Sequence, residues 1–438
     1  MRLRLLLALL ALVITSGRHA EAVDAPAVCP KALAGLAQCF AGQDQEGAFY
    51  WMAMPAKWNG VLVVHAHGGP RLSVPTEANS AVDLARFAVI VEAGYAWVNS
   101  SYRRPGFGVQ MAIEDSEHAR EAFIARFGQP RRTIAHGQSW GGNVMAKLDE
   151  AMPRGADGKP VYDGVLLTSG MLGGGTHGYD FRIDLRAVYQ YYCHNHPRPD
   201  ETQYPLNIGL PPDSRLSRAD LVARVDQCTG VGRKAAERTA AQARALHNIL
   251  SVVQLPERTL VAHLAWATFM FRDIVAERLG GKSPFGNIGV VYRGSDDDAT
   301  LNRDLPRFAA DPAAVAALAA DADLAGRISV PTLTMHAADD PTAFVEVEAR
   351  YRASVAAAGK SDLLLQNFVE EHEHSFLTAP EYPTALDALL HWIDTGRKPT
   401  TAGVAAACAD AARHYPGRCS FLPEFRPRPF DSRIYPRG

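Results

Sequence analysis

The clearest chemical signal in the sequence is Gly137-Gln138-Ser139-Trp140-Gly141, which lies between a predicted strand and a predicted helix. A serine at such a sharp turn holds its Oγ above the sheet edge, and flanking glycines leave room for the strained backbone and the approaching helix. That hydroxyl can attack a carbonyl carbon once a base removes its proton. The pattern predicts Ser139 as a nucleophile in acyl transfer, against the alternative of a glycine-rich turn without chemistry.

A second glycine-rich element, His67-Gly68-Gly69-Pro70, directly follows a predicted strand that ends near His65. Acyl transfer builds negative charge on the carbonyl oxygen, and each preset backbone N–H donor at that point contributes about 3–4 kcal/mol. We assign one donor to Gly69, with Gly68 as the alternative. The other is the N–H of Trp140, the residue after the nucleophile.

Serine needs a base, and the base needs an acid partner that fixes its tautomer. Two carboxylates, Asp339 and Asp340, follow a predicted strand that ends at Met335-His336. Loops at the carboxyl ends of parallel strands commonly carry the chemistry of such sheets. We take Asp340 as the acid and keep Asp339 as the alternative.

The base is expected in the acidic loop from Glu370 to Phe376, just before the last predicted core helix. His372 and His374 compete there, because residues two apart in an extended loop point the same way. We favour His374, since the apolar Phe376 and Leu377 behind it would anchor its part of the loop on the core. A solvated histidine or half of a metal cluster is the alternative for either one.

Strands and helices must alternate to position these loops, and the apolar patterns indicate that they do. Predicted strands cover residues 46–53, 61–65, 96–99, 133–136, 161–168, 328–335 and 363–369. Predicted helices cover residues 81–93, 115–127, 140–152, 342–358 and 383–393. The fold class is therefore α/β, with a doubly wound and mostly parallel sheet.

The alternation lapses in the middle of the chain, where helical segments at 235–253 and 263–277 follow one another. We interpret residues 171–326 as a largely helical inserted cap. The core is then split into residues 23–170 and 327–398, and a tail rich in Pro and Arg covers 399–438.

The N-terminal residues 1–22 are typical of a secretory signal peptide. Arg2 and Arg4 precede an apolar run from Leu5 to Ile14, and we place cleavage after Ala22. A membrane anchor would need about 20 apolar residues. No later stretch looks long enough to span, so we expect a secreted or periplasmic protein without a membrane anchor.

Six cysteines in an exported chain indicate disulfides. Order along the chain favours the pairs Cys29–Cys39, Cys193–Cys228 and Cys408–Cys419, although other pairings are open. A metal site at Cys193-His194-Asn195-His196 is the alternative, but no second ligand cluster stands at a suitable spacing. We therefore expect neither a metal nor a cofactor.

The charge balance argues against nucleic acid as a partner. Lys plus Arg (45) nearly equals Asp plus Glu (47), and 47% of the residues are hydrophobic. Without a basic run to neutralise phosphates, any substrate must be recognised at a local site.

With the order Ser139, Asp340, His374 and the His-Gly-Gly element, the chain resembles an α/β-hydrolase over residues 46–170 and 327–398. The stretch around Trp58-Asn59-Gly60 is similar to secreted esterases of the tannase and feruloyl esterase type. The His-Gly-Gly-Pro string is similar to proline iminopeptidases, whose further glycine is replaced here by Arg71.

The resemblance implies an exported serine hydrolase that cleaves a small or polymeric carboxylic ester through an acyl-enzyme. A peptidase of the same fold is the first alternative, and a binding protein without turnover is the second. Candidate substrate-binding residues are Gly68, His177, Arg103 and Tyr192. Candidate pocket walls are the cap aromatics Tyr189, Tyr191, Tyr192, Trp266, Phe269 and Phe271.

Overall fold

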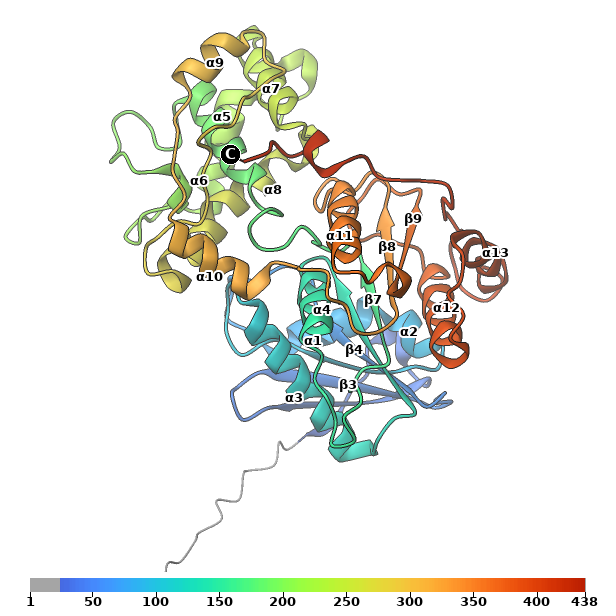
Figure 1. Cartoon of the computed structure of the whole chain (residues 1–438). Helices are drawn as coiled ribbons and strands as arrows, with labels where there is room; N and C mark the ends of the chain where they lie inside the picture. Colours follow the sequence, from blue (N-terminus) through green and yellow to red (C-terminus); the bar gives the residue numbers. More distant parts are fainter. Residues whose placement is uncertain (1–23, 438) are drawn as a thin grey trace, which may run out of the picture.

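A nine-stranded sheet in the order β1-β2-β3-β5-β4-β6-β7-β8-β9 forms the centre of the computed structural model, which describes residues 24–437 (Figure 1). The predicted signal peptide and the cleavage point after Ala22 lie outside the described residues. The strands are β1 (Ala25–Ala27), β2 (Ala37–Gln43), β3 (Phe49–Pro55), β4 (Val61–Ala66), β5 (Ala96–Ser100), β6 (Arg132–Gln138), β7 (Gly164–Thr168), β8 (Thr332–Ala337) and β9 (Leu364–Val369).

The sheet is doubly wound and mostly parallel, as the sequence predicts. Strands β4 to β9 pair in parallel, and β1, β2 and β3 add an antiparallel edge that joins through β5. Every residue of β4, β7 and β8 is buried, which agrees with their continuous apolar runs. The hairpin of β1 and β2 is absent from the sequence prediction, because its short strands carry no alternating apolar pattern.

Helices cover both faces of the sheet. On one face, α3 (Val109–Phe127), α4 (Trp140–Glu150) and α11 (Glu346–Ala357) share a core with Leu62 and Val64. On the other face, α1 (Glu77–Arg86), α2 (Ala88–Glu92) and α12 (Glu381–Thr395) pack with Val61 and Val63. The two cores meet the alternate side chains of a single strand, as the two-residue repeat of a strand requires.

Between β7 and β8 the described chain forms helices and no strands. These are α5 (Phe181–Cys193), α6 (Arg218–Thr229), α7 (Ala240–Val253), α8 (Leu260–Ala265), α9 (Asp298–Asp304) and α10 (Pro312–Ala322). Helices α5 to α9 surround a hydrophobic cluster of their own, which includes Leu185, Leu221 and Ile249, whereas Leu318 of α10 belongs to the core shared with α3 and α4. This helical region, hereafter the cap, stands above the carboxyl ends of the strands in Figure 1.

One helical stretch among the described residues, Glu257–Arg278, is long and apolar enough to cross a membrane. The sequence expectation that no later stretch is long enough was therefore wrong on length and composition. However, 67% of its most apolar window is buried inside the molecule. Its apolar surface is thus occupied by contacts within this chain.

The three disulfides are those expected from chain order, Cys29–Cys39, Cys193–Cys228 and Cys408–Cys419. The second joins the end of α5 to α6 within the cap. The third joins α13 (Thr401–Ala411) to the segment that follows it. Three disulfides and no free cysteine among the described residues are typical of an oxidising compartment.

The C-terminal segment returns from α13 across the edge of the sheet to the cap (Figure 1). Ile434 is buried in the hydrophobic cluster of the cap, and the Tyr435 hydroxyl donates to the Val252 carbonyl over 2.7 Å. Arg437 forms two hydrogen bonds of 2.9 and 3.0 Å with the carboxylate of Asp184 on α5. Residues 430–437 therefore fasten the cap to the rest of the chain.

Candidate active site

Ser139 occupies the sharp turn between β6 and α4 with a left-handed backbone, φ 57°. The turn needs glycine on both sides. A Cβ on Gly137 would lie 2.1 Å from the carbonyl oxygen of Gly141, and one on Gly141 would lie 2.0 Å from that of Ala66. A non-glycine residue in this conformation costs about 1–3 kcal/mol and persists only where its surroundings hold it. Here the Ser139 N–H donates to the Thr168 carbonyl over 3.0 Å.

The structure brings three of the predicted side chains into one hydrogen-bonded row. His374 Nε2 lies 2.7 Å from Ser139 Oγ, and His374 Nδ1 lies 2.7 Å from Asp340 Oδ2. Asp340 is fully buried after β8, whereas the side chain of His374, after β9, is 20% exposed. The buried carboxylate can therefore orient the imidazole, whose other nitrogen faces the partly exposed Ser139.

The competing pair lies at the surface. His372 Nδ1 is 3.1 Å from Asp339 Oδ2, and the two side chains are 72% and 76% exposed. Neither side chain contacts Ser139. The loop that carries both histidines thus contributes one of them to the row and leaves the other in solvent.

Asp340 lies between two histidines. On the side away from His374, His336 Nε2 is 3.6 Å from Asp340 Oδ2 and also bonds the Ala343 carbonyl over 2.7 Å. His336 Nδ1 lies 3.1 Å from Glu348 Oε1, and both of these side chains are fully buried. Sequence reasoning missed His336 because Glu348 lies on the following helix. The position of His336 at the end of β8, four residues before Asp340, was the available signal.

The electrostatics of this cluster favour charged groups. Burial alone would raise the pKa of the Asp340 carboxyl, but His374, His336 and the Thr342 N–H outweigh burial and lower it. Burial alone would lower the pKa of His336, but the Glu348 and Asp340 carboxylates outweigh burial and raise this pKa. The carboxylate form of Asp340 and the protonated form of its neighbour His336 are therefore both favoured.

The two predicted oxyanion elements are the first residue of α4 and the loop after β4, which contacts the serine turn through Gly68 and Gln138. Trp140 is the first residue of α4, so its N–H has no acceptor within the helix. Gly69 adopts φ 61° in the loop after β4. Its neighbour Gly68 packs on the side chain of Gln138, where a Cβ would lie 2.3 Å from Oε1. The Gln138 amide in turn donates to Ser375 Oγ, which ties this loop to the one that carries His374.

The remaining predicted binding residues lie elsewhere. His177 is partly exposed, with Nδ1 3.6 Å from a carboxylate oxygen of Asp180. Tyr192 is half-buried in the cap, with its ring 4.9 Å from that of Tyr191. No contact joins either residue to Ser139 in the described part of the chain. The sequence indicated only that these side chains follow a strand or lie in the cap.

Arg103 is committed to a network of carboxylates. Its guanidinium bonds Asp115 over 2.6 Å and Glu114 over 2.7 Å, and it also pairs with Glu46. A substrate carboxylate would have to displace one of these partners.

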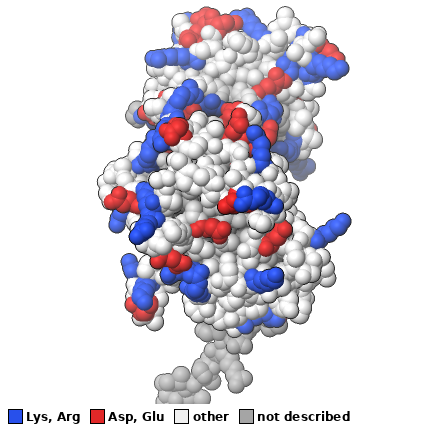
Figure 2. Space-filling model, turned by 90° about the vertical axis from the view of Figure 1, so that its right-hand side faces the viewer, with Lys and Arg blue, Asp and Glu red and all other residues white. Residues whose placement is uncertain are grey.

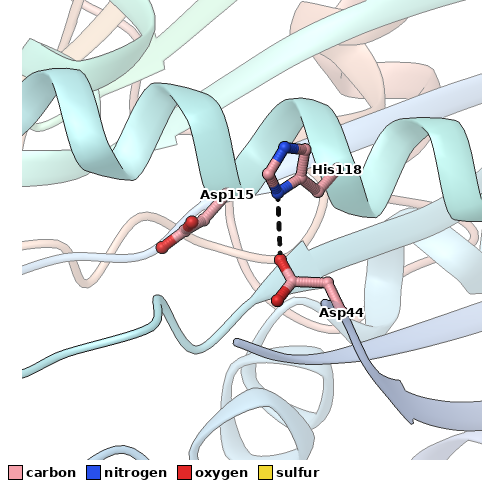
Figure 3. A group of neighbouring side chains, drawn as sticks. All are labelled: Asp44, Asp115 and His118. Atoms are coloured by element: carbon pink, nitrogen blue, oxygen red, sulfur yellow. Dashed lines mark hydrogen bonds and ion pairs between the residues drawn. The ribbon is translucent and has the colours of Figure 1, made fainter. Parts of the chain in front are cut away.

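The same region holds a group of possible metal ligands, Asp44, Asp115 and His118, whose ligand atoms lie within 4.8 Å of one another (Figure 3). Both oxygens of Asp115 already accept hydrogen bonds from Arg103, and Asp44 accepts two from backbone N–H groups. The guanidinium of Arg103 therefore already provides a positive charge here, and we interpret the group as part of an ion-pair network.

Among the predicted pocket walls, Trp266 is connected through other rings to Trp140, the residue after Ser139. Its ring stacks on Tyr179 at 4.2 Å, Tyr179 contacts Phe107 at 5.9 Å, and Phe107 contacts Trp140 at 5.6 Å. Phe271 is buried with its ring 5.8 Å from that of Trp266, whereas Tyr189 is buried in the hydrophobic cluster of the cap. Tyr179 and Phe107 were missed because nothing in the local sequence separates them from ordinary core aromatics.

Comparison with known proteins finds no matching family model and no matching curated protein. Several solved structures are similar in overall fold. An esterase from Aspergillus oryzae has 14% identity and a TM-score of 0.42, covering 83% of this chain and 81% of that one. The closed state of Candida antarctica lipase A has 12% identity and a TM-score of 0.44, covering 91% of each chain.

An acylaminoacyl peptidase is also similar, with 10% identity and a TM-score of 0.34 over 83% of this chain and 41% of that one. Identities and scores of this size carry no conclusion about activity. The strand order, the serine turn after β6 and the loops after β8 and β9 match the α/β-hydrolase fold.

Proposed function

We propose that this protein is a serine hydrolase that cleaves carboxylic esters through an acyl-enzyme. The observation that carries the proposal is the 2.7 Å contact between His374 Nε2 and Ser139 Oγ at a strained strand-to-helix turn. A strained backbone, an aligned imidazole and a buried carboxylate behind it together match the requirements of nucleophilic catalysis.

In the first half-reaction, Ser139 Oγ attacks the ester carbonyl while its proton passes to His374 Nε2. Asp340 stabilises the resulting imidazolium through Nδ1–H, and the N–H groups of Gly69 and Trp140 bind the oxyanion. The tetrahedral intermediate then collapses. The C–O bond to the alcohol breaks, and His374 returns the proton to the leaving oxygen.

In the second half-reaction, water attacks the acyl carbon of the ester formed with Ser139. His374 takes a proton from that water and later returns it to Ser139 Oγ, so that acid is released and the enzyme is restored. Every group that takes part in this proposed mechanism, apart from substrate and water, is a side chain or a backbone N–H of this chain.

We further propose that the protein works after export, in a secreted or periplasmic location, on a small-molecule or polymeric ester. The three disulfides support an oxidising compartment. On the face in Figure 2, Lys and Arg are interspersed with Asp and Glu, which offers no strip of one sign for a nucleic acid.

The test is labelling of the purified mature protein with a fluorophosphonate probe, together with Ser139→Ala and the surface control Ser361→Ala. We expect labelling of the wild type and of Ser361→Ala, and none of Ser139→Ala. Turnover of aryl esters but not of aminoacyl anilides supports the esterase, and the reverse supports a peptidase. Absence of labelling in the folded wild type would leave a binding protein.

A further inference from the structure

Arg182, in the first turn of α5, is a buried cation without a counter-ion. Arg182 is only 2% exposed. Its hydrogen bond to the protein runs from Nη1 to the Gly178 carbonyl over 3.4 Å, and its Nε has no partner. Within residues 24–437, no carboxylate forms an ion pair with it. A buried charge in this state is costly, and in most proteins it is paired.

The nearby carboxylates are already used by another arginine. Asp184, on the same helix, binds Arg437 over 2.9 Å and accepts a 2.6 Å hydrogen bond from Tyr292. Asp180, just before the helix, lies 3.6 Å from Arg437. The chain thus supplies counter-ions on both sides of Arg182 in sequence and directs them to a different partner.

Three aromatic rings surround the guanidinium of Arg182. It lies 4.4 Å from the ring centroids of Trp266 and Phe181, and 5.1 Å from that of Tyr179. Such contacts stabilise a desolvated cation, but they engage its charge through ring faces and leave its Nε–H without an acceptor. Burial lowers the pKa of Arg182 to about 9, so the side chain remains charged at neutral pH.

Contacts connect Arg182 to the turn that presents Ser139. The Met171 N–H donates to the Ser139 carbonyl over 2.9 Å, so the segment leading into α5 begins at the nucleophile. Tyr179, in that segment, contacts Phe107, which packs on Trp140.

A second connection runs to the loop of the acid. The ring of His263 lies 5.1 Å from that of Phe181, the residue before Arg182, and its Nε2 lies 2.9 Å from the Pro341 carbonyl. Pro341 directly follows Asp340. Arg182 is therefore linked both to the nucleophile turn and to the loop that carries the acid.

We propose that Arg182 binds a carboxylate carried by the substrate, and that the preferred substrates are esters with a free carboxylate, such as mono-esters of dicarboxylic acids. The inference rests on the proposed ester hydrolysis at Ser139. The substrate carboxylate accepts hydrogen bonds from the unused N–H groups and completes the charge pair, while the aromatic rings exclude water around it. The part of the substrate between the two groups then spans from Ser139 to the cap.

Arg186 provides a matched control on the same helix. It lies one turn further on, is equally buried and has no carboxylate partner. Its Nη2 donates to the Gly209 carbonyl over 3.1 Å and lies 3.5 Å from the Tyr204 hydroxyl. These partners belong to the cap and not to the segment around Ser139, so we assign Arg186 a structural role.

The first experiment compares kcat/KM for monomethyl and dimethyl esters of straight-chain dicarboxylic acids from succinate to suberate. We expect the wild type to prefer the mono-ester at the best chain length by about 30- to 100-fold, the size of a charged hydrogen-bonded contact. In Arg182→Gln this ratio should fall to about 1, whereas Arg186→Gln should keep the wild-type ratio. A wild-type ratio near 1, with both esters hydrolysed, would overturn the inference and leave the proposed function intact.

The second experiment does not depend on turnover. The free dicarboxylates should slow labelling of Ser139 by a neutral fluorophosphonate in the wild type, and their dimethyl esters should not. The protection should be weaker in Arg182→Lys and lost in Arg182→Gln. Equal labelling with and without dicarboxylate in the wild type rejects the anion site, even if neither variant folds. Absence of any labelling of folded wild type contradicts the proposed function itself.

Discussion

The carboxyl ends of the strands and the cap differ in whether every buried charge is paired, because the cap pairs Asp184 with Arg437 but leaves two other buried arginines without a carboxylate. At the carboxyl ends of the strands, each buried charge beside Ser139 has a partner within the chain. Asp340 is paired with His374, and His336 is paired with Glu348. In the cap, Arg182 and Arg186 are just as buried and have no carboxylate. The difference suggests a division of labour. Under the proposed mechanism, the carboxyl ends of the strands supply the groups for proton transfer, and the carboxylate of the proposed substrate neutralises the charge left in the cap.

The largest expected effect separates the two histidines of one loop. His374→Ala should lower kcat/KM for aryl esters by about 10⁴-fold or more, because Ser139 then has no base. His372→Ala, two residues away and exposed, should change it by less than about 3-fold. Steady-state kinetics with both variants measures the contrast. Equal losses, or a larger loss in His372→Ala, would mean that the partner seen for Ser139 is not the working base.

The next effect concerns two buried histidines inside the sheet, which unlike His336 have no carboxylate to stabilise their protonated form. His65 and His136 face each other on β4 and β6 with Nδ1 atoms 3.0 Å apart. Burial, above all, holds the pKa of His65 well below its usual range and lowers that of His136 to about 3. The unfolded chain therefore binds protons that the folded chain does not, below about pH 6.5.

Stability should accordingly fall as the pH drops from about 6.5 toward 3, by about 1.4 kcal/mol per pH unit for each histidine. Urea unfolding at a series of pH values measures the slope. The slope should be shallower in His136→Gln, which removes one of the two groups. A slope that is unchanged in this variant would assign the acid sensitivity to other groups.

The third prediction concerns the cap. Deleting residues 430–438 removes the buried Ile434 and leaves Asp184 without Arg437, which should destabilise the cap by about 3–5 kcal/mol. Hydrogen exchange should accelerate in α5 and α7, while β4 and β6 remain protected. If exchange rose equally in the sheet, the two regions would unfold as one unit and the contrast between them would not extend to stability.

The smallest effect tests the charge behind Asp340. In His336→Gln the carboxylate of Asp340 has one positive neighbour fewer and attracts a protonated His374 more strongly. We expect kcat/KM to fall by about 3- to 10-fold and its acid limb to move up by about 0.5–1 pH unit. Glu348→Gln should move the limb by less, because it removes a carboxylate together with the charge on His336 that this carboxylate favours.

Thr334→Val provides the control for that shift. It removes a 2.9 Å hydrogen bond to Glu348 but no charge. Its acid limb should stay in place. A shift as large as that of His336→Gln would show that packing, and not charge, sets the profile.

Local patterns were enough to predict the elements that carry Ser139, Asp340 and His374, because each chemical group sits at a strand end marked by its own sequence. The predicted strands 61–65 and 133–136 fall within β4 and β6. Choosing His374 over His372 relied on the apolar residues that follow it. Phe376 is 68% exposed and Leu377 is buried. Only Leu377 therefore anchors the His374 loop on the core as expected.

What the sequence did not predict depends on partners that lie on other elements of the fold. His336 matters because of Glu348, and Arg182 because no carboxylate reaches it, which is a property of the folded chain as a whole. Arg103 was proposed for substrate because it follows a strand, yet Asp115 and Glu46 from other elements occupy it. Local spacing cannot show whether a charge is already paired.

The pairing of Arg437 with Asp184 also bears on the order of folding, because it joins residues 253 positions apart in the chain. Contacts at such separations pay the entropy of closing a long loop before they gain any interaction energy. The serine turn needs only neighbouring strands and can form early, whereas α5 receives its counter-charge at a late step. During refolding from denaturant, the backbone of the serine turn should therefore form before the cap is complete, whereas labelling of Ser139 should appear late, because His374 lies 235 positions away in the chain.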